Sequence, residues 1–213
     1  MFEKIPSSIG QALIHQRAGM DSVVYNQLYR RRRTGRLDLR STAFVFNGRL
    51  PVRFTADGAG VSPPLLWSDV PANTGSIALI VEDADSPTPH PLVHAIVVDL
   101  GAEVESIEEG ALDSPQHRGE GLAMGPNSFL QQAWLPPDPP CGHGEHRYVF
   151  QIFALQDGTR APDAPGRHAF IDLVLERAIA VGCLLGTYER VPREPIAEGT
   201  ESTLALRSDA GIA

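Results

Sequence analysis

The sequence is poor in cysteine and contains no long apolar run. Its 213 residues include only two cysteines, Cys141 and Cys183, which are too few for a disulfide framework in a chain of this length. We therefore expect a reducing, cytoplasmic compartment. No stretch approaches the roughly 18 apolar residues that a membrane-spanning helix needs. The N-terminus has no basic segment followed by an apolar one, so we expect neither a signal peptide nor integral membrane association.

Basic residues are also scarce relative to acidic ones. The chain has 18 Lys and Arg against 26 Asp and Glu, which gives a formal net charge of −8 and argues against nucleic acid as a partner. The arginine run at residues 30–33 is therefore interpreted as a solvated helix end rather than a patch for an anionic surface. The chain lacks a Walker loop, a strand-associated Gly-x-Gly-x-x-Gly and a Gly-x-Ser-x-Gly elbow. Nothing thus points to nucleotide binding or to serine hydrolase chemistry.

What remains is the composition of a globular protein, with 42% hydrophobic and 21% charged residues. Residues 1–36 predict an N-terminal helical extension, in which Gly19 separates two helices and Asp21 caps the second. A single domain is expected at residues 37–192. Residues 193–213 are polar and aperiodic, and they predict a flexible C-terminal tail.

Short segments rich in β-branched residues predict strands within this domain. The clearest ones are at residues 76–82, 93–100, 147–155 and 186–191. One helix is expected at residues 167–181, ended by Gly182. Because no long helix lies between the earlier strands, parallel β–α–β units are not expected. The fold class predicted is mainly β: an antiparallel Greek-key β-sandwich with flanking helices.

Two acidic residues follow the first of these strands. Asp83 and Asp85 are two positions apart, so both carboxylates point to the same side if the backbone is extended. Such a pair can bind a metal ion, orient a histidine or simply begin a turn, since Asp, Ser and Pro all favour turns. The residues by themselves leave these alternatives open.

Histidines at two other strand starts are further candidates. His94 opens an apolar strand, where a lone histidine is more often a satisfied core residue than a functional one. His146 and Tyr148 are two positions apart at the start of another strand and should face one way, with Arg147 facing the other.

The segment before Tyr148 also raises two chemical alternatives. Cys141, His143 and His146 invite a zinc site, but their spacing matches no common pattern and lacks an obvious fourth ligand. Cys141 and His146 could form a nucleophile pair, which would need a thiol of lowered pKa and an oxyanion site. We expect neither.

The order and spacing of these motifs resemble the phosphatidylethanolamine-binding protein family, which includes the Raf kinase inhibitor-like proteins, and its bacterial branch most closely. The matching segments are Asp83-Ala-Asp-Ser-Pro87, His94 in its strand, Pro139-Pro-Cys-Gly-His-Gly-Glu-His-Arg-Tyr148, Ser62-Pro-Pro-Leu-Leu-Trp67 and Leu185-Gly-Thr-Tyr188. The resemblance covers roughly residues 40–190.

The resemblance implies a β-sandwich with flanking helices and a small surface pocket for phosphate-like anions and phospholipid head groups. Carried over position by position, it assigns the ligand site to Asp83, Asp85, Pro87, His94, His146 and Tyr148. The histidines and the tyrosine would donate hydrogen bonds to the anion, and the acids would fix the imidazole rings.

The same resemblance implies a binding protein rather than an enzyme, with no catalytic residue, no metal and no cofactor. The alternative is an enzyme that uses the Asp and His cluster for acid–base or metal-assisted hydrolysis. A regulatory role, a protein partner and a homodimer are left open. The sequence also departs from the family pattern: Ala84 replaces a proline, Pro136 stands at a glycine position, and Asp138 adds a negative charge near the expected pocket mouth.

Overall fold

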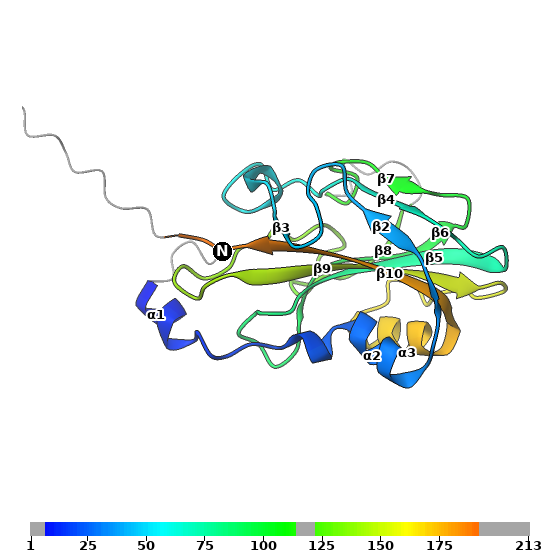
Figure 1. The fold of residues 1–213 in the computed structure, drawn as a ribbon, viewed down its shortest axis with the longest axis horizontal. Coiled ribbons are helices and arrows are strands. Elements are labelled where there is room, and N and C mark those ends of the chain that lie inside the picture. Colours follow the sequence, from blue (N-terminus) through cyan, green and yellow to red (C-terminus); the bar gives the residue numbers. More distant parts are fainter. Residues whose placement is uncertain (1–6, 114–121, 192–213) are drawn as a thin grey trace, which may run out of the picture.

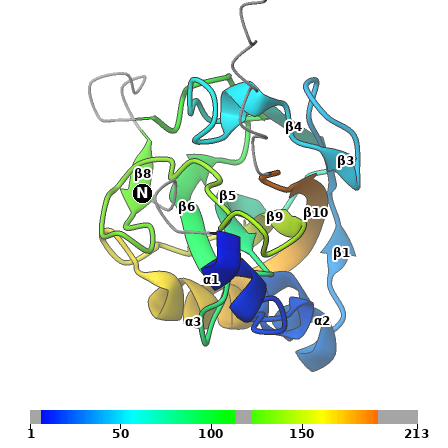
Figure 2. The same ribbon diagram turned by 90° about the vertical axis from the view of Figure 1, so that its left-hand side faces the viewer.

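The computed structural model describes residues 7–113 and 122–191, and these residues form three layers (Figures 1 and 2). A seven-stranded sheet lies in the middle, with a three-stranded sheet over one face and helices over the other. The strands are β1 (Gly35–Arg36), β2 (Asp38–Arg40), β3 (Gly48–Arg49), β4 (Leu65–Ser68), β5 (Thr74–Asp83), β6 (Leu92–Gly101), β7 (Ser106–Ile107), β8 (Ala123–Gly125), β9 (His146–Gln156) and β10 (Ala178–Tyr188). The helices are α1 (Ser7–Ala12), α2 (Val24–Arg31) and α3 (Arg167–Arg177), with short 3-10 turns at Met20–Ser22 and Val52–Phe54. The tail predicted at 193–213 lies outside the described residues.

The large sheet has the strand order β1-β10-β9-β5-β6-β8, and β3 also pairs with β10. Its long strands pair with one another in antiparallel orientation, β10 with β9, β9 with β5, and β5 with β6. The short strands β1 and β3 instead pair with β10 in parallel. The predicted mainly β class with flanking helices is therefore confirmed, but the predicted antiparallel pairing holds only for the long strands, and the mixed sheet is not plainly that of a Greek-key sandwich. The chain leaving α2 runs alongside β10 in the same direction, which makes the sheet mixed.

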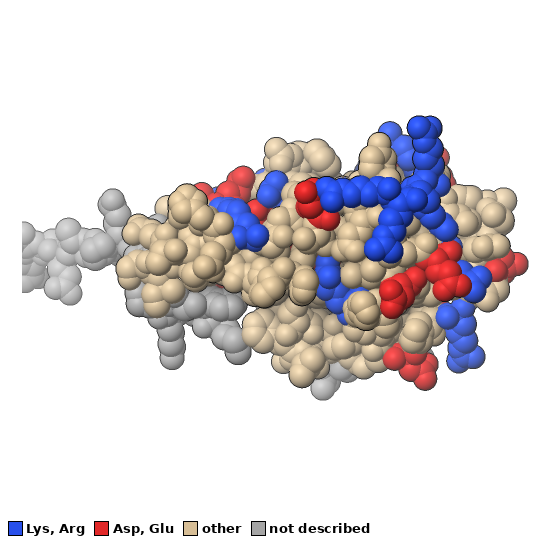
Figure 3. Space-filling model, turned by 90° about the horizontal axis from the view of Figure 1, so that it is seen from below, with Lys and Arg blue, Asp and Glu red and all other residues tan. Residues whose placement is uncertain are grey.

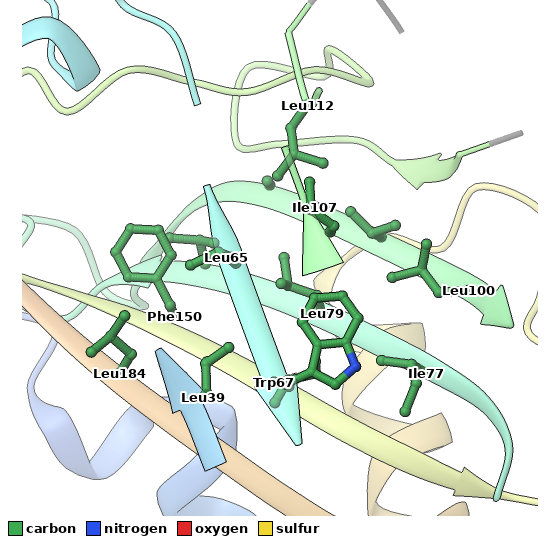
Figure 4. Close-up of a cluster of buried hydrophobic side chains, with 14 of the residues drawn as sticks. Leu39, Leu65, Trp67, Ile77, Leu79, Leu100, Ile107, Leu112, Phe150 and Leu184 are labelled. Atoms are coloured by element: carbon green, nitrogen blue, oxygen red, sulfur yellow. The ribbon is translucent and has the colours of Figure 1, made fainter. Parts of the chain in front are cut away.

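One hydrophobic core lies between the two sheets. Leu65 and Trp67 of β4 pack with Ile77 and Leu79 of β5, as the close-up in Figure 4 shows. All four side chains are at most 3% exposed. Because full burial of such a side chain is worth about 1.5–3 kcal/mol, this layer contributes strongly to stability.

A second core lies between the other face of the large sheet and the helices. Ile80 of β5 and Phe153 of β9 pack there with Val24 and Leu28 of α2, and α3 adds Phe170. Both faces of β5 are thus buried, which explains its nearly continuous apolar sequence. The division into an extension at 1–36 and a domain at 37–192 stays a prediction, but α2 packs directly on the sheet.

A buried carboxylate joins these helices to the sheet. Glu82 at the end of β5 is fully buried, and its Oε2 accepts hydrogen bonds from Val24 N (2.9 Å) and Gln151 Nε2 (2.7 Å). Arg167 of α3 donates from Nε to Oε1 of the same carboxylate at 2.7 Å. Loss of one partner from a buried ion pair costs about 3–5 kcal/mol, so the pair with Arg167 fixes α3 to the sheet. The hydrogen bond from Val24 N ties α2 to the same carboxylate.

The helix predicted at residues 167–181 is shorter than expected. It ends at Arg177, and β10 begins at the next residue without a loop. Apolar residues continue through this junction because β10 is buried against β9, so the sequence pattern does not mark the change. Gly182, expected to end the helix, lies within β10, where a Cβ would come within 2.8 Å of the Leu37 carbonyl oxygen. Of the predicted strand at 186–191, only residues 186–188 lie in β10, and residues 189–191 belong to no strand.

The helix-covered face carries most of its charged side chains toward one end (Figure 3). Asp21 does not cap α2 as predicted, because Val23 takes the cap position, and the Asp21 carboxylate pairs with Arg30 instead. Arg32 donates from Nη1 to the carbonyl of Glu176 at 3.2 Å. Within residues 7–113 and 122–191, no helix is both long and apolar enough to cross a membrane.

Candidate functional site

A cavity of about 270 Å³ lies where β5 ends and where β6 and β9 begin. Four of the predicted ligand-site residues line it, namely Asp83, Pro87, His94 and His146. They meet because Asp83 pairs with Leu92 of β6 on one side and with Tyr148 of β9 on the other. The remaining wall is mostly apolar, with several proline side chains from residues 136–140.

The two predicted acids have different environments. Oδ2 of Asp83 is hydrogen-bonded to Nδ1 of His146 at 2.7 Å, and Oδ1 of Asp83 accepts the Asp85 N–H at 2.8 Å. Asp85 lies outside the cavity lining and binds Arg147 through two hydrogen bonds of 2.7 Å each. The two carboxylates were expected on the same side only if the backbone is extended, and this condition is not met, since β5 ends at Asp83 and the chain turns directly afterwards.

Asp85 serves as an internal anchor. Arg17 Nη1 lies 3.0 Å from its Oδ1, and Arg147 N donates to Oδ2 at 2.9 Å. Burial raises the pKa of Asp85, but the hydrogen bonds from Arg147 and Arg17 outweigh it and lower the pKa below its ordinary value. Asp85 is therefore ionised at neutral pH and holds the strand start that carries His146.

His146 belongs to a chain of hydrogen bonds that leads away from the cavity. Its Nε2 lies 2.6 Å from Nδ1 of His143, and Nε2 of His143 lies 2.8 Å from the Leu13 carbonyl oxygen. A carbonyl oxygen only accepts, so His143 carries a hydrogen on Nε2. A neutral His143 then accepts at Nδ1 from the N–H of His146. Nδ1 of His146 is hydrogen-bonded to Asp83, so both ring nitrogens of His146 are engaged within the protein.

The position of His143 bears on the metal alternative. His143 is fully buried, and burial first, followed by the charge of His146, lowers its pKa. The two imidazole nitrogens that a zinc ion would need face each other in a hydrogen bond. Among residues 7–113 and 122–191 no cluster of three His, Cys, Asp or Glu side chains is placed to hold a metal ion.

Of His94, His143 and His146, only His94 has a ring nitrogen without a hydrogen-bond partner among the described residues. Its Nδ1 lies 2.5 Å from the Leu135 carbonyl oxygen, so Nδ1 carries the hydrogen and donates. Burial lowers the pKa of His94, and this outweighs the opposing effect of the Asp83 carboxylate. The neutral ring therefore presents Nε2 as an acceptor, and this buried atom has no hydrogen-bond partner in the part of the chain that the structure describes.

Two further buried polar atoms beside His94 lack hydrogen-bond partners within residues 7–113 and 122–191, namely the hydroxyl of Tyr148 and Nε1 of Trp134. The His94 ring centroid lies 5.2 Å from that of Tyr148 and 5.9 Å from that of Trp134. Tyr148 is fully buried and is not part of the cavity lining. Burial, reinforced by the charge of Asp83, raises its pKa well above 10. Trp134 was not singled out from the sequence, where nothing distinguishes it from a core aromatic.

At the cavity mouth, one arginine is shared by two carboxylates. Asp138, which adds an acid to the lining, forms an ion pair with Arg190. Arg190 also contacts Asp57 at 2.8 Å. The lining residues include no lysine or arginine. Any negative charge on a bound ligand must therefore be met by hydrogen bonds rather than by a lining cation.

Comparison with known proteins shows the family to which the chain is related. The family model for phosphatidylethanolamine-binding protein matches residues 40–189. The UPF0098 protein of Chlamydia trachomatis is 32% identical over 158 residues, which cover 72% of this chain and 99% of the relative. The UPF0098 protein of Aquifex aeolicus is 30% identical over 155 residues, covering 72% of this chain and 89% of that protein.

Solved structures show the same relationship. The crystal structure of CT736 from Chlamydia trachomatis, described as a homologue of phosphatidylethanolamine-binding protein, has a TM-score of 0.65 at 31% identity and covers 74% of this chain and 99% of its own. E. coli YbcL, described as a member of the mammalian family, has a TM-score of 0.68 at 25% identity, covering 73% of this chain and 99% of its own. The chain belongs to the phosphatidylethanolamine-binding protein family.

Proposed function

We propose that the protein binds a small ligand with a phosphate-like anionic head group in the cavity beside His94. The observation that carries this proposal is the unpartnered Nε2 of His94, a buried atom of a residue on the cavity wall. A buried polar group without a hydrogen bond costs about 1–3 kcal/mol, and a ligand that supplies the missing partner recovers that energy on binding.

The protonation of His94 defines the form of the ligand. Because burial keeps this ring neutral, Nε2 accepts a hydrogen bond from the P–O–H of a singly protonated phosphate. A doubly charged phosphate binds only if His94 takes up a proton, which a bound anion favours. Both routes add a proton to the complex, so affinity increases as the pH falls toward 6.

The apolar wall further narrows the ligand class. Leu92, Phe129, Leu135 and the prolines can cover carbon atoms next to the head group. A phosphate monoester with an organic substituent is therefore favoured over free phosphate, whereas the phosphodiester of a phospholipid head group, which has no P–O–H near pH 7, binds only when His94 is protonated. The enzyme alternative has less support, because both nitrogens of His146 are already hydrogen-bonded to Asp83 and His143.

The test is a titration with inorganic phosphate, O-phosphoethanolamine and phosphotyrosine, followed by the side-chain NMR signals of the histidines between pH 6 and 7. We expect saturable shifts for His94 and His146 that vanish in His94→Gln. His90→Gln is the matched control, because His90 is exposed and does not line the cavity. At 100 times its dissociation constant a bound ligand should add about 2.7 kcal/mol to the unfolding free energy. Shifts that survive in His94→Gln would refute the proposal.

A further inference from the structure

Residues 7–19, here called the N-terminal arm, lie against the two loops that form the cavity. The arm contains α1, which sits at the end of the molecule where β9 begins (Figures 1 and 2). Ala18 N donates to the Ser86 carbonyl at 3.1 Å, and Gly19 N donates to the Ala84 carbonyl at 2.7 Å. The arm therefore continues the backbone pairing of the segment that contains Pro87, although it lies outside the residues matched by the family model.

Arg17 attaches the arm to the other loop. Its Nη1 donates to the Glu145 carbonyl at 2.8 Å, and its Nη2 donates to the His143 carbonyl at 3.1 Å. The same guanidinium lies 3.0 Å from the buried carboxylate of Asp85. One side chain of the arm thus contacts the residue before His146 and the acid that anchors the strand start.

The backbone of α1 also approaches this loop very closely. Gly10 is buried, and a Cβ at this position would overlap the carbonyl oxygen of Cys141. Only glycine allows this approach without a shift of backbone atoms. The close approach brings the carbonyls of Leu13 and Gln16 to within 2.8 and 3.2 Å of His143 Nε2.

These contacts connect the arm to the ligand site through one histidine. The carbonyls of the arm accept from His143 Nε2, which leaves Nδ1 of His143 as the acceptor for His146. Without the arm, His143 can move its hydrogen to Nδ1, and two N–H groups would then oppose each other. His146 would have to turn or lose its proton, and its hydrogen bond with Asp83 would change.

We propose that His143 is a positioning residue and that docking of the N-terminal arm sets the proton and orientation of His146 in the ligand site. Arm docking and ligand binding are then thermodynamically coupled, so each strengthens the other by the same factor. This inference rests on the proposed function for its effect on affinity, but its effect on His146 requires no ligand.

Gly10→Ala tests the coupling, because the added methyl group displaces α1 without changing any residue of the cavity. Gln11→Ala is the matched control, since Gln11 is a neighbour in the same helix and its side chain is exposed. Hydrogen exchange of residues 7–19 and the ring nitrogen signals of His146 are measured first, in the full-length protein without ligand. We expect at least tenfold faster exchange of the arm and a changed His146 spectrum in Gly10→Ala only.

The dissociation constant of O-phosphoethanolamine is then compared between the same proteins. We expect binding to weaken at least fivefold in Gly10→Ala, and saturating O-phosphoethanolamine to slow arm exchange in the parent. Arg17→Gln should also speed exchange of the arm, change the His146 spectrum and weaken binding. Agreement between the two variants would show that the effect does not come from a folding defect specific to position 10. A released arm with an unchanged His146 spectrum would overturn the inference. If the parent binds none of the phosphate probes, the proposed function fails, while the His146 spectrum still decides this inference.

Discussion

Two tyrosines on neighbouring strands offer a matched test of the buried polar groups. Tyr148 and Tyr188 are 0% and 3% exposed. The Tyr148 hydroxyl has no hydrogen-bond partner, whereas the Tyr188 hydroxyl donates to Asp57 Oδ2 at 2.7 Å. Replacement by phenylalanine removes the same oxygen from both positions, so the structure predicts opposite effects on stability.

The magnitudes follow from the two environments. A buried hydroxyl without a partner costs about 1–3 kcal/mol, so Tyr148→Phe should raise the unfolding free energy by about 1 kcal/mol. A hydrogen bond to a charged group is worth about 1.5–3 kcal/mol, so Tyr188→Phe should lower it by about 2 kcal/mol. Urea denaturation with a shared m-value measures both changes, because neither variant alters the surface exposed on unfolding.

The refuting result is a loss of stability in Tyr148→Phe as large as that in Tyr188→Phe. It would mean that the Tyr148 hydroxyl is hydrogen-bonded in solution, for instance to an ordered water molecule. The same variant also tests whether Tyr148 donates to the ligand. A tenfold weaker affinity for O-phosphoethanolamine would support that prediction from the sequence, and an unchanged affinity would assign Tyr148 to the core instead.

Three further predictions concern titratable groups. Asp85→Asn should lower the unfolding free energy by only about 1 kcal/mol in chemical denaturation, because it removes the charge that Arg147 pairs with, while the Arg147 side chain is 40% exposed and water compensates much of the loss. Burial lowers the folded-state pKa of His94 and His143, so the unfolded chain binds more protons below pH 6.5. Stability should therefore fall as the pH drops from 7 to 5, by up to about 1.4 kcal/mol per pH unit for each histidine, and less steeply in His143→Gln. Burial raises the pKa of the Cys183 thiol to about 12, so its alkylation by iodoacetamide at pH 8 should be slow in the native protein and fast in urea.

The strands could be predicted from the sequence where the local pattern decides the structure. Residues 76–82 fall within β5 and residues 147–155 fall within β9, since both segments are rich in β-branched and aromatic residues. The boundary between α3 and β10 could not be predicted, because the apolar residues run without interruption from one to the other. The parallel pairing of β1 and β3 could not be predicted either, since two-residue strands carry almost no periodic signal.

The site was predictable only in part for a similar reason. The motif order located Asp83, His94 and His146, and the structure brings these three together around one cavity. The hydrogen bond from His143 to Leu13 joins residues 130 positions apart, and no spacing rule connects them. The donor and acceptor roles of the three histidines could not be predicted from the sequence either, because they depend on which ring nitrogen forms a hydrogen bond with each neighbour.

The buried carboxylate of Glu82 has a consequence for the modularity of this protein. The residues matched by the family model begin at position 40, yet Glu82 receives one of its hydrogen bonds from the backbone of Val24. Removing the first 36 residues would expose a charged cluster and the apolar face of the sheet together. The N-terminal segment is therefore a structural part of the domain, and its deletion would destabilise the rest of the fold. A viable shortened chain would need a compensating change at position 82, at Arg167 or at the apolar positions that α2 covers.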